Sequence, residues 1–67
     1  MAWQPLKSSM LSAMDYDAQL RILHVRFVRG EVYDYRDVPP DVAEGLASAP
    51  SAGRYFNEAI RGRYRPL

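Results

Sequence analysis

The C-terminal quarter of the chain holds the side chains best suited to bind an anion. Residues 51–67 contain four arginines and one glutamate, whereas residues 1–50 contain five basic and seven acidic residues. In the segment RGRYR (61–65) arginines alternate with a tyrosine. Guanidinium groups pair with phosphates, and aromatic rings stack on exposed bases. The pattern therefore predicts a site for RNA or DNA, formed by Arg61, Arg63, Tyr64 and Arg65.

A second candidate anion site lies at the start of a predicted helix, in the sequence SAGR (51–54). There the free backbone N–H groups of a helix N-terminus meet a hydroxyl, a residue without a Cβ and a guanidinium, a combination suited to phosphate. Ser51, Gly53 and Arg54 are the residues of this candidate site. The alternative is a capped helix in which Gly53 lets the backbone pack close to the sheet.

The arginines also have alternative explanations that do not involve a nucleic acid. They would equally form a solvated helix face and a frayed tail. They would also pair with carboxylates within the fold or across a dimer, and the candidates for such pairs are Asp34, Asp37 and Asp41.

Residues that could perform catalysis or hold a metal are scarce. His24 is the single histidine, and it lies at an alternating strand position with no identifiable nucleophile or acid partner. With one histidine and no cysteine, a zinc site is not expected. The aspartates fall in predicted turns and strand ends, where capping and turn bonding account for them. We therefore expect no catalytic residue, no metal and no cofactor, and predict that the protein is not an enzyme.

The length and composition indicate a single small domain. A chain of 67 residues buries only about 60% of the surface that its unfolded form exposes, so we expect one domain over residues 1–67, with a core at about 7–64 and loose termini. No stretch approaches the roughly 18 to 20 apolar residues that span a bilayer, and the N-terminus lacks a leader pattern, which favours a cytoplasmic protein without a membrane partner. The formal net charge of +1 excludes a protein that coats nucleic acid by bulk charge alone.

Three predicted strands precede two predicted helices. Strands are expected at 9–16, 21–28 and 31–36, and the second is clearest because its apolar residues alternate with polar ones. Short connections between them predict an antiparallel meander. Pro39 and Pro40 end the strands and start a helix that ends near Ser48. Ser51 then caps a helix from Ala52 to about Arg61. The sequence thus predicts an α+β fold, a three-stranded antiparallel meander followed by two short helices packed on one face.

Hairpin register decides whether Tyr33 and Tyr35 are core residues or an exposed platform. A loop of residues 29–31 would place Phe27 opposite Tyr33 and Val25 opposite Tyr35, so that the rings join the apolar face. A turn of residues 29–30 would turn the tyrosines to the other face of the sheet, beside His24. Burial of the rings uses the scarce apolar area of a small domain better, and we favour it.

The chain resembles the KTSC domain family from about Lys7 to Tyr64. The resemblance rests, in order, on the pair Ser8-Ser9, the Tyr16-Asp17 turn, the alternating Leu23, Val25 and Phe27, the Tyr-x-Tyr of Tyr33 and Tyr35, the Val38-Pro39 step, and the segment SAGRYFNEAIRGRY (51–64). Asp15 departs from it, because similar sequences often carry a small residue such as glycine there. The resemblance implies a small domain that occurs alone in bacterial and phage proteins and at the C-terminus of some lysyl-tRNA synthetases. That attachment implies RNA as a partner by association.

Two functions remain after these observations. The first is a small non-enzymatic binding module that contacts RNA or DNA phosphates through the C-terminal arginines and the helix N-terminus. The second is a protein-interaction or self-assembly domain without nucleic-acid contact, in which the aromatic residues and an open sheet edge meet a protein partner or form a homodimer.

Overall fold

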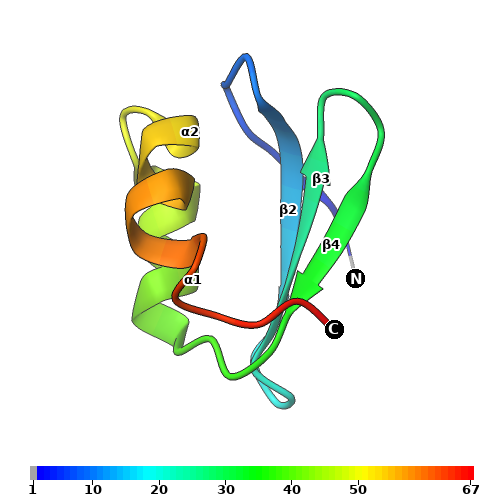
Figure 1. The fold of residues 1–67 in the computed structure, drawn as a ribbon, viewed down its shortest axis with the longest axis vertical. Helices are drawn as coiled ribbons and strands as arrows, with labels where there is room; N and C mark the ends of the chain where they lie inside the picture. The colour runs from blue at the N-terminus through cyan, green and yellow to red at the C-terminus, as the bar shows by residue number, and fades with distance from the viewer. Residues whose placement is uncertain (1) are drawn as a thin grey trace.

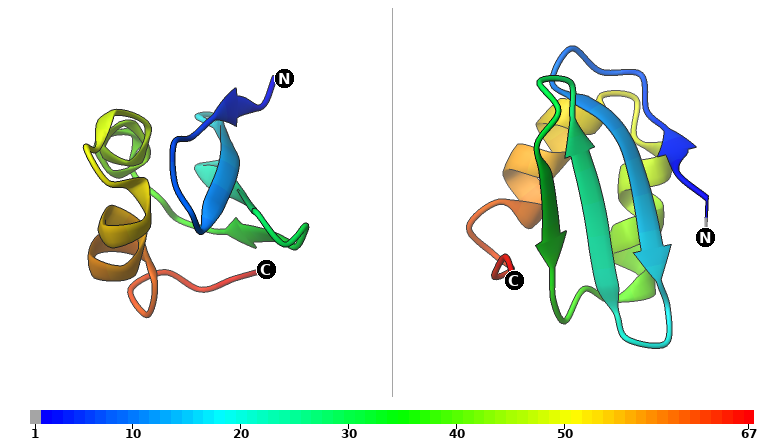
Figure 2. Two further views of the ribbon diagram at one scale, coloured as in Figure 1. Left: turned by 90° about the horizontal axis from the view of Figure 1, so that it is seen from above. Right: turned by 90° about the vertical axis from the view of Figure 1, so that its right-hand side faces the viewer.

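The computed structural model describes residues 2–67 and confirms the α+β class. A four-stranded antiparallel sheet in the order β1-β2-β3-β4 forms one layer, and the helices form a second layer on one of its faces (Figures 1 and 2). The elements are β1 (Gln4–Pro5), β2 (Leu11–Asp17), β3 (Ile22–Phe27), β4 (Val32–Tyr35), α1 (Pro40–Ser48), α2 (Ala52–Tyr55) and a π-helical turn, η1 (Phe56–Ile60).

The sheet has one more strand than the sequence predicts. In β1, Gln4 pairs with Met14 and Pro5 with Ala13 of β2, so the meander of three strands gains an edge strand. A strand of two residues has no alternating pattern, and proline at an edge position lacks the donor that marks a strand. β2 runs through Asp15 to Asp17, so the departure at Asp15 does not end the strand.

The register between β3 and β4 differs by two residues from the predicted one. Tyr35 lies opposite Leu23 and Tyr33 opposite Val25, and the N–H of Phe27 donates to the carbonyl of Glu31 at 2.8 Å. The predicted loop of residues 29–31 is therefore wrong, and residues 28–30 make the turn. A shift of two positions keeps each side chain on the same face of a strand. Both tyrosines accordingly lie on the apolar face, as expected.

The helices begin and end where the sequence predicts. Pro40 opens α1 after Pro39 in extended backbone, and a proline loses nothing in the first turn, where no internal donor is needed. The side chain of Ser51 accepts from the N–H of Arg54 at 3.3 Å and caps α2. After Ile60 the chain leaves the helix, and Gly62 adopts a φ of 77°, which suits a residue without a Cβ.

The predicted second helix consists of two parts. Only α2 is α-helical, and η1 continues it with a wider turn in which the N–H of Arg61 donates to the carbonyl of Phe56 at 2.8 Å. Such π-helical turns insert an extra residue and re-aim the side chains beyond them. Phe56 and Ile60 both point into the core despite this change.

The core lies between the sheet and the helices. Every element except β1 contributes side chains to the core, and the link between β4 and α1 contributes one as well. They are Leu11, Met14, Leu23, Val25, Tyr35, Val38, Ala43, Leu46, Ala52, Phe56 and Ile60. Because the helices cover one face only, the opposite face of the sheet is left without a covering layer (Figure 2, right).

The C-terminal tail returns to the sheet. Residue 66 forms a bridge with Tyr35, the N–H of Arg36 donates to the carbonyl of Arg65 at 3.2 Å, and the N–H of Leu67 donates to the carbonyl of Asp34 (Figure 1). Residues 65–67 thus hold backbone hydrogen bonds or a bridge to the end of β4. Within residues 2–67, no helix is long and apolar enough to span a bilayer.

Candidate functional site

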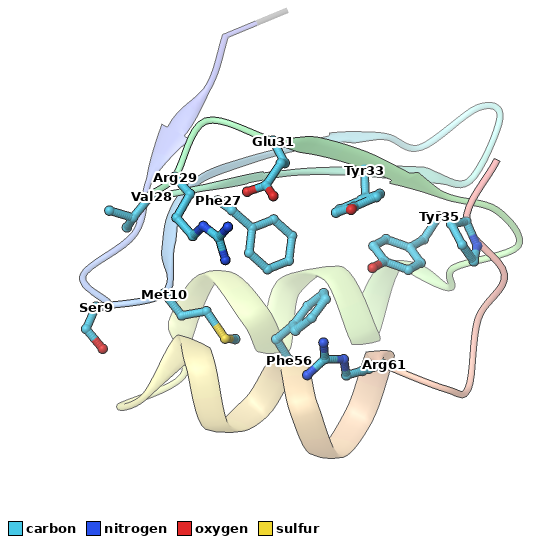
Figure 3. A pocket seen from close by; sticks show the side chains of 11 residues that line it. Ser9, Met10, Phe27, Val28, Arg29, Glu31, Tyr33, Tyr35, Phe56 and Arg61 are labelled. Carbon is cyan, nitrogen blue, oxygen red and sulfur yellow. The ribbon is translucent and has the colours of Figure 1, made fainter.

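A groove opens between β4, the β3–β4 turn and η1. Its volume is about 470 Å³, and Figure 3 shows its lining side chains. Aromatic rings form its floor and walls. One guanidinium group extends into it from the β3–β4 turn and another from the end of η1. Its lining includes Met10, Phe27, Arg29, Glu31, Tyr33, Tyr35, Phe56, Arg61 and Pro66.

Four rings pack edge to face along the groove. Phe27 is perpendicular to both Tyr33 and Phe56, with ring centroids 5.5 Å apart in each pair, and Tyr35 lies 5.7 Å from Phe56. Edge-to-face pairs of this kind contribute about 0.5–1.5 kcal/mol each beyond the area that they bury. Tyr35 is 7% exposed, whereas Tyr33 is 45% exposed. The interpretation as core therefore holds for Tyr35, and Tyr33 is a ring at the mouth of the groove.

The charged groups of the groove come from two sides. Arg29 lies in the β3–β4 turn, and Arg61 follows η1, where its side chain also donates to Asn57 at 3.3 Å. Burial raises the pKa of Tyr35, the positive charge of Arg61 opposes that rise, and Tyr33 adds to it. Arg61 and Tyr35 thus line the same groove.

A smaller hollow gathers the remaining C-terminal arginines. Arg36, Arg63 and Arg65 line a volume of about 270 Å³ together with Asp37 and Tyr64. Asp37 has a φ of 60°, a left-handed conformation that aspartate tolerates better than most residues, and it turns the chain out of β4. Arg63 also donates from Nε to the carbonyl of Glu58 at 2.9 Å. We call this set of residues the arginine hollow.

The start of α2 is a packed helix end. A Cβ added to Gly53 would lie 3.2 Å from the hydroxyl of Ser8 and 3.7 Å from the side chain of Met10, so a neighbouring loop passes close to the helix there. Ser51 uses its hydroxyl to cap the N–H of Arg54. The alternative of a capped helix with close packing at Gly53 therefore describes this region, and Arg54 is its exposed cation.

Within residues 2–67, one basic and one acidic side chain lie within salt-bridge distance of each other, and the basic one is not an arginine. His24 Nδ1 lies 2.6 Å from Asp34 Oδ1 on the uncovered face of the sheet, where the guanidinium of Arg26 also stacks on Trp3 at 4.3 Å. The expectation that His24 has no acid partner is therefore wrong, because the two-residue shift in register brings Asp34 opposite it. The proposed pairing of the C-terminal arginines with Asp34, Asp37 and Asp41 inside the fold is not formed.

Comparison with known proteins identifies the family. Residues 7–64 match the KTSC domain. This chain belongs to the KTSC domain family. The crystal structure of a KTSC domain protein from Yersinia pestis superposes with a TM-score of 0.94 at 32% identity, covering 98% of this chain and 93% of that one. The fold described above is therefore the fold of the KTSC domain.

Other relatives of this KTSC domain differ in total length. A protein of Tsukamurella paurometabola is 42% identical over 96% of both chains. A lysine–tRNA ligase of Nostoc punctiforme is 37% identical over 88% of this chain, but the match spans only 10% of the ligase. The domain thus resembles both a protein of its own size and a small part of a much larger enzyme.

The structure divides the predicted site residues of this KTSC domain among three places. Arg61, Tyr33 and Tyr35 line the groove, whereas Arg63, Tyr64 and Arg65 line the arginine hollow. Ser51, Gly53 and Arg54 form the helix start. Reasoning from sequence missed Arg29 and Arg36, which it assigned to a turn and a strand end. No local signal marks them, because each becomes part of a site only when the tail and helix pack beside it.

The carboxylates and the histidine of this KTSC domain do not gather into a site. Within residues 2–67, no three His, Cys, Asp or Glu side chains approach each other in a way that would hold a metal ion. Neither His24 nor Asp34 lines the groove or the arginine hollow. The two hollows offer guanidinium groups and aromatic rings, with one carboxylate in each lining, Glu31 in the groove and Asp37 in the arginine hollow.

Proposed function

We propose that this KTSC domain is a non-enzymatic module that binds RNA by contacting phosphates through the arginine hollow. One observation carries the proposal. Arg36, Arg63 and Arg65 line one hollow together with Tyr64, and within residues 2–67 no carboxylate lies within 4.0 Å of any of the three guanidinium groups. Guanidinium groups without a carboxylate partner are available to phosphates, which they bind with two parallel hydrogen bonds.

The relatives support RNA rather than another polyanion. Lysine–tRNA ligases carry a segment 36–37% identical to this domain, and their name states that they act on a tRNA. An appended domain that contacts the same RNA would raise its local concentration at the enzyme. The cytoplasmic location expected from the sequence remains a prediction, and it agrees with such a partner.

Two further arginines extend the proposed surface. Arg61 and Arg54 are exposed on the helical layer, and Arg61 precedes the arginine hollow by two residues in the chain. We assign both to the electrostatic attraction of the phosphate backbone. Ser51 and Gly53 shape the helix end beside Arg54 and are given no direct contact, because the Ser51 hydroxyl already accepts a backbone N–H.

Binding measured against salt concentration tests the proposal. Labelled tRNA and single-stranded RNA and DNA are titrated with the wild type and with the double variant Arg63→Gln/Arg65→Gln. Removal of one phosphate-binding charge makes the slope of log K against log salt shallower by about 0.7 for a single strand, so removal of two changes it by about 1.4. Lower affinity with this shallower slope is the expected result.

A matched control removes two charges elsewhere. Lys7→Gln/Arg26→Gln changes the net charge equally, but Arg26 stacks on Trp3 on the uncovered sheet face and Lys7 precedes β2. We expect this variant to keep a slope close to that of the wild type. Absence of salt-dependent binding to every nucleic acid would refute the proposal, as would an equal weakening of binding in the two double variants.

Self-assembly through the edge of β4 is the second candidate. The C-terminal tail pairs with this edge only at residues 34–36. At the uncovered part of the strand, Val32 is 48% exposed and Tyr33 is 45% exposed. An open strand edge with apolar side chains can pair with a second copy around a two-fold axis. Sedimentation over a range of concentrations tests this candidate. A dimer that Val32→Lys dissociates would support it, and a monomer at every concentration would refute it.

A further inference from the structure

The groove offers a second surface for stacking besides Tyr64 of the arginine hollow. Tyr33 stands at its mouth with 45% of its surface exposed, and the ring of Phe27 meets it edge-on at 5.5 Å. Phe27 is held in turn by Phe56, which is buried. A ring supported in this way has a fixed orientation. Little conformational entropy of the Tyr33 side chain is therefore lost when a planar ligand stacks on it.

The charges around the groove suit a nucleotide. In Figure 3 the guanidinium groups of Arg29 and Arg61 extend into the groove from the turn side and from the helix side. Neither has a carboxylate within ion-pair distance in the described residues. Glu31 is the acidic side chain of the lining, and its carboxylate accepts hydrogen bonds of the kind that base amino groups donate. Two cations and one acceptor around aromatic rings complement a base flanked by phosphates.

The groove also adjoins the arginine hollow. Pro66 lines the groove, and Arg65, its neighbour in the tail, lines the arginine hollow. A strand whose backbone contacts the arginine hollow therefore reaches the groove across the tail. The volume of about 470 Å³ lies within the range of about 300–1,000 Å³ that is usual for small-molecule sites.

We infer that the groove binds one unpaired base of a single strand, stacked on Tyr33 with its flanking phosphates at Arg29 and Arg61. This inference rests on the proposed RNA-binding function and adds to it a preference for single-stranded over double-stranded segments. Base pairing and stacking within a duplex cover the faces and edges of a base, so a duplex cannot use the groove.

Binding of a short single strand and of its duplex is compared for three variants. Tyr33→Leu removes the aromatic face and keeps an apolar side chain beside Phe27, Tyr33→Phe keeps the ring, and Trp3→Leu removes an exposed ring on the uncovered sheet face. Removal of one base–aromatic stack weakens single-strand binding about 5- to 150-fold. We expect that weakening in Tyr33→Leu alone, with duplex binding unchanged in all three. Amide NMR spectra of each variant check that the fold is kept.

The position of the base is read independently. A strand with 2-aminopurine in place of one adenine reports stacking by a decrease of fluorescence, and adenosine monophosphate is titrated while amide signals of residues 27–35 and 56–61 are followed. Fluorescence quenching that Tyr33→Leu abolishes, with shifts confined to these residues, supports the inference.

The outcomes separate the inference from the proposed function. Equal affinity for single strand and duplex, unaffected by Tyr33→Leu but lowered by Arg63→Gln/Arg65→Gln, would overturn the inference and leave the proposed function in place. No salt-dependent binding to either form would overturn both. Capture of an extended peptide by the groove, abolished in Tyr33→Leu, would also overturn the inference, because the groove would then recognise protein.

Discussion

Replacement of Gly45 by alanine should destabilise the domain, although the same change normally stabilises a helix. Gly45 lies inside α1, where alanine is favoured over glycine by about 1 kcal/mol. Here the added Cβ would overlap the Tyr55 hydroxyl oxygen and would lie 2.6 Å from Cζ of the same ring. Real Cβ atoms do not approach a ring so closely, so the ring must move.

The loss in free energy of unfolding can be estimated from the contacts that the Tyr55 ring loses when it moves. Tyr55 is packed against the core, and its hydroxyl donates to the carbonyl of Val42 at 3.0 Å. Overpacking costs about 1–3 kcal/mol, and breaking a hydrogen bond costs about 0.5–1.5 kcal/mol. After the gain in helix propensity, the free energy of unfolding should fall by about 0.5–3.5 kcal/mol. For a domain of this size, each kcal/mol lowers Tm by about 4–8 °C.

Urea unfolding followed by circular dichroism measures this change, and a second background isolates its cause. In Tyr55→Ala the obstructing ring is absent, so Gly45→Ala should there raise stability by about 1 kcal/mol. The sign of the substitution thus reverses between the two backgrounds. If Gly45→Ala stabilised the wild type as much as it stabilises Tyr55→Ala, the predicted contact between helix and ring would be refuted.

Three further predictions concern a cap, a pH dependence and an ion pair. Ser51→Ala removes the cap of α2 and should cost about 1 kcal/mol, measured by thermal unfolding; Ser51→Gly should cost only a few tenths. Because burial raises the pKa of Tyr35 above its unfolded value of 10.0, its contribution to stability is complete below pH 10.0 and is lost as the pH rises through the folded pKa. Urea unfolding from neutral to alkaline pH should show this fall, and an equally steep fall in Tyr35→Phe would contradict it. A double-mutant cycle with His24→Gln and Asp34→Asn should give a coupling of about 0.2–1 kcal/mol that salt weakens, since both side chains are partly exposed; a coupling insensitive to salt would contradict it.

Local signals explain why the helices could be predicted from the sequence. Pro39 and Pro40 stop a strand and open a helix through their fixed φ and missing donor, and Ser51 caps a helix through its own hydroxyl. These effects act within four residues, so they do not depend on the rest of the fold. The alternation of apolar residues in β3 likewise fixed which of its side chains face the core.

The assembly of the candidate sites could not be predicted in the same way. Arg36 reaches the arginine hollow because the tail pairs with the end of β4, and Arg29 shares the groove with Arg61 because the β3–β4 turn and the end of η1 pack beside each other. Each arrangement depends on contacts between residues more than twenty positions apart. The sequence supplied the arginines and the aromatic rings, but not which of them share a hollow.

The amino-acid sequence by itself determined the α+β class and the ends of the helices, and it favoured the apolar face of the sheet for Tyr33 and Tyr35. Only the tertiary structure decided the pairing register, the added strand β1 and the difference in exposure between the two tyrosines. The physical reason is that side chains alternate along a strand with a period of two, so local pattern fixes the face but leaves a shift of two residues undetermined. Packing of the whole chain selects among those shifts, and with them the partner of His24 and the shape of the groove.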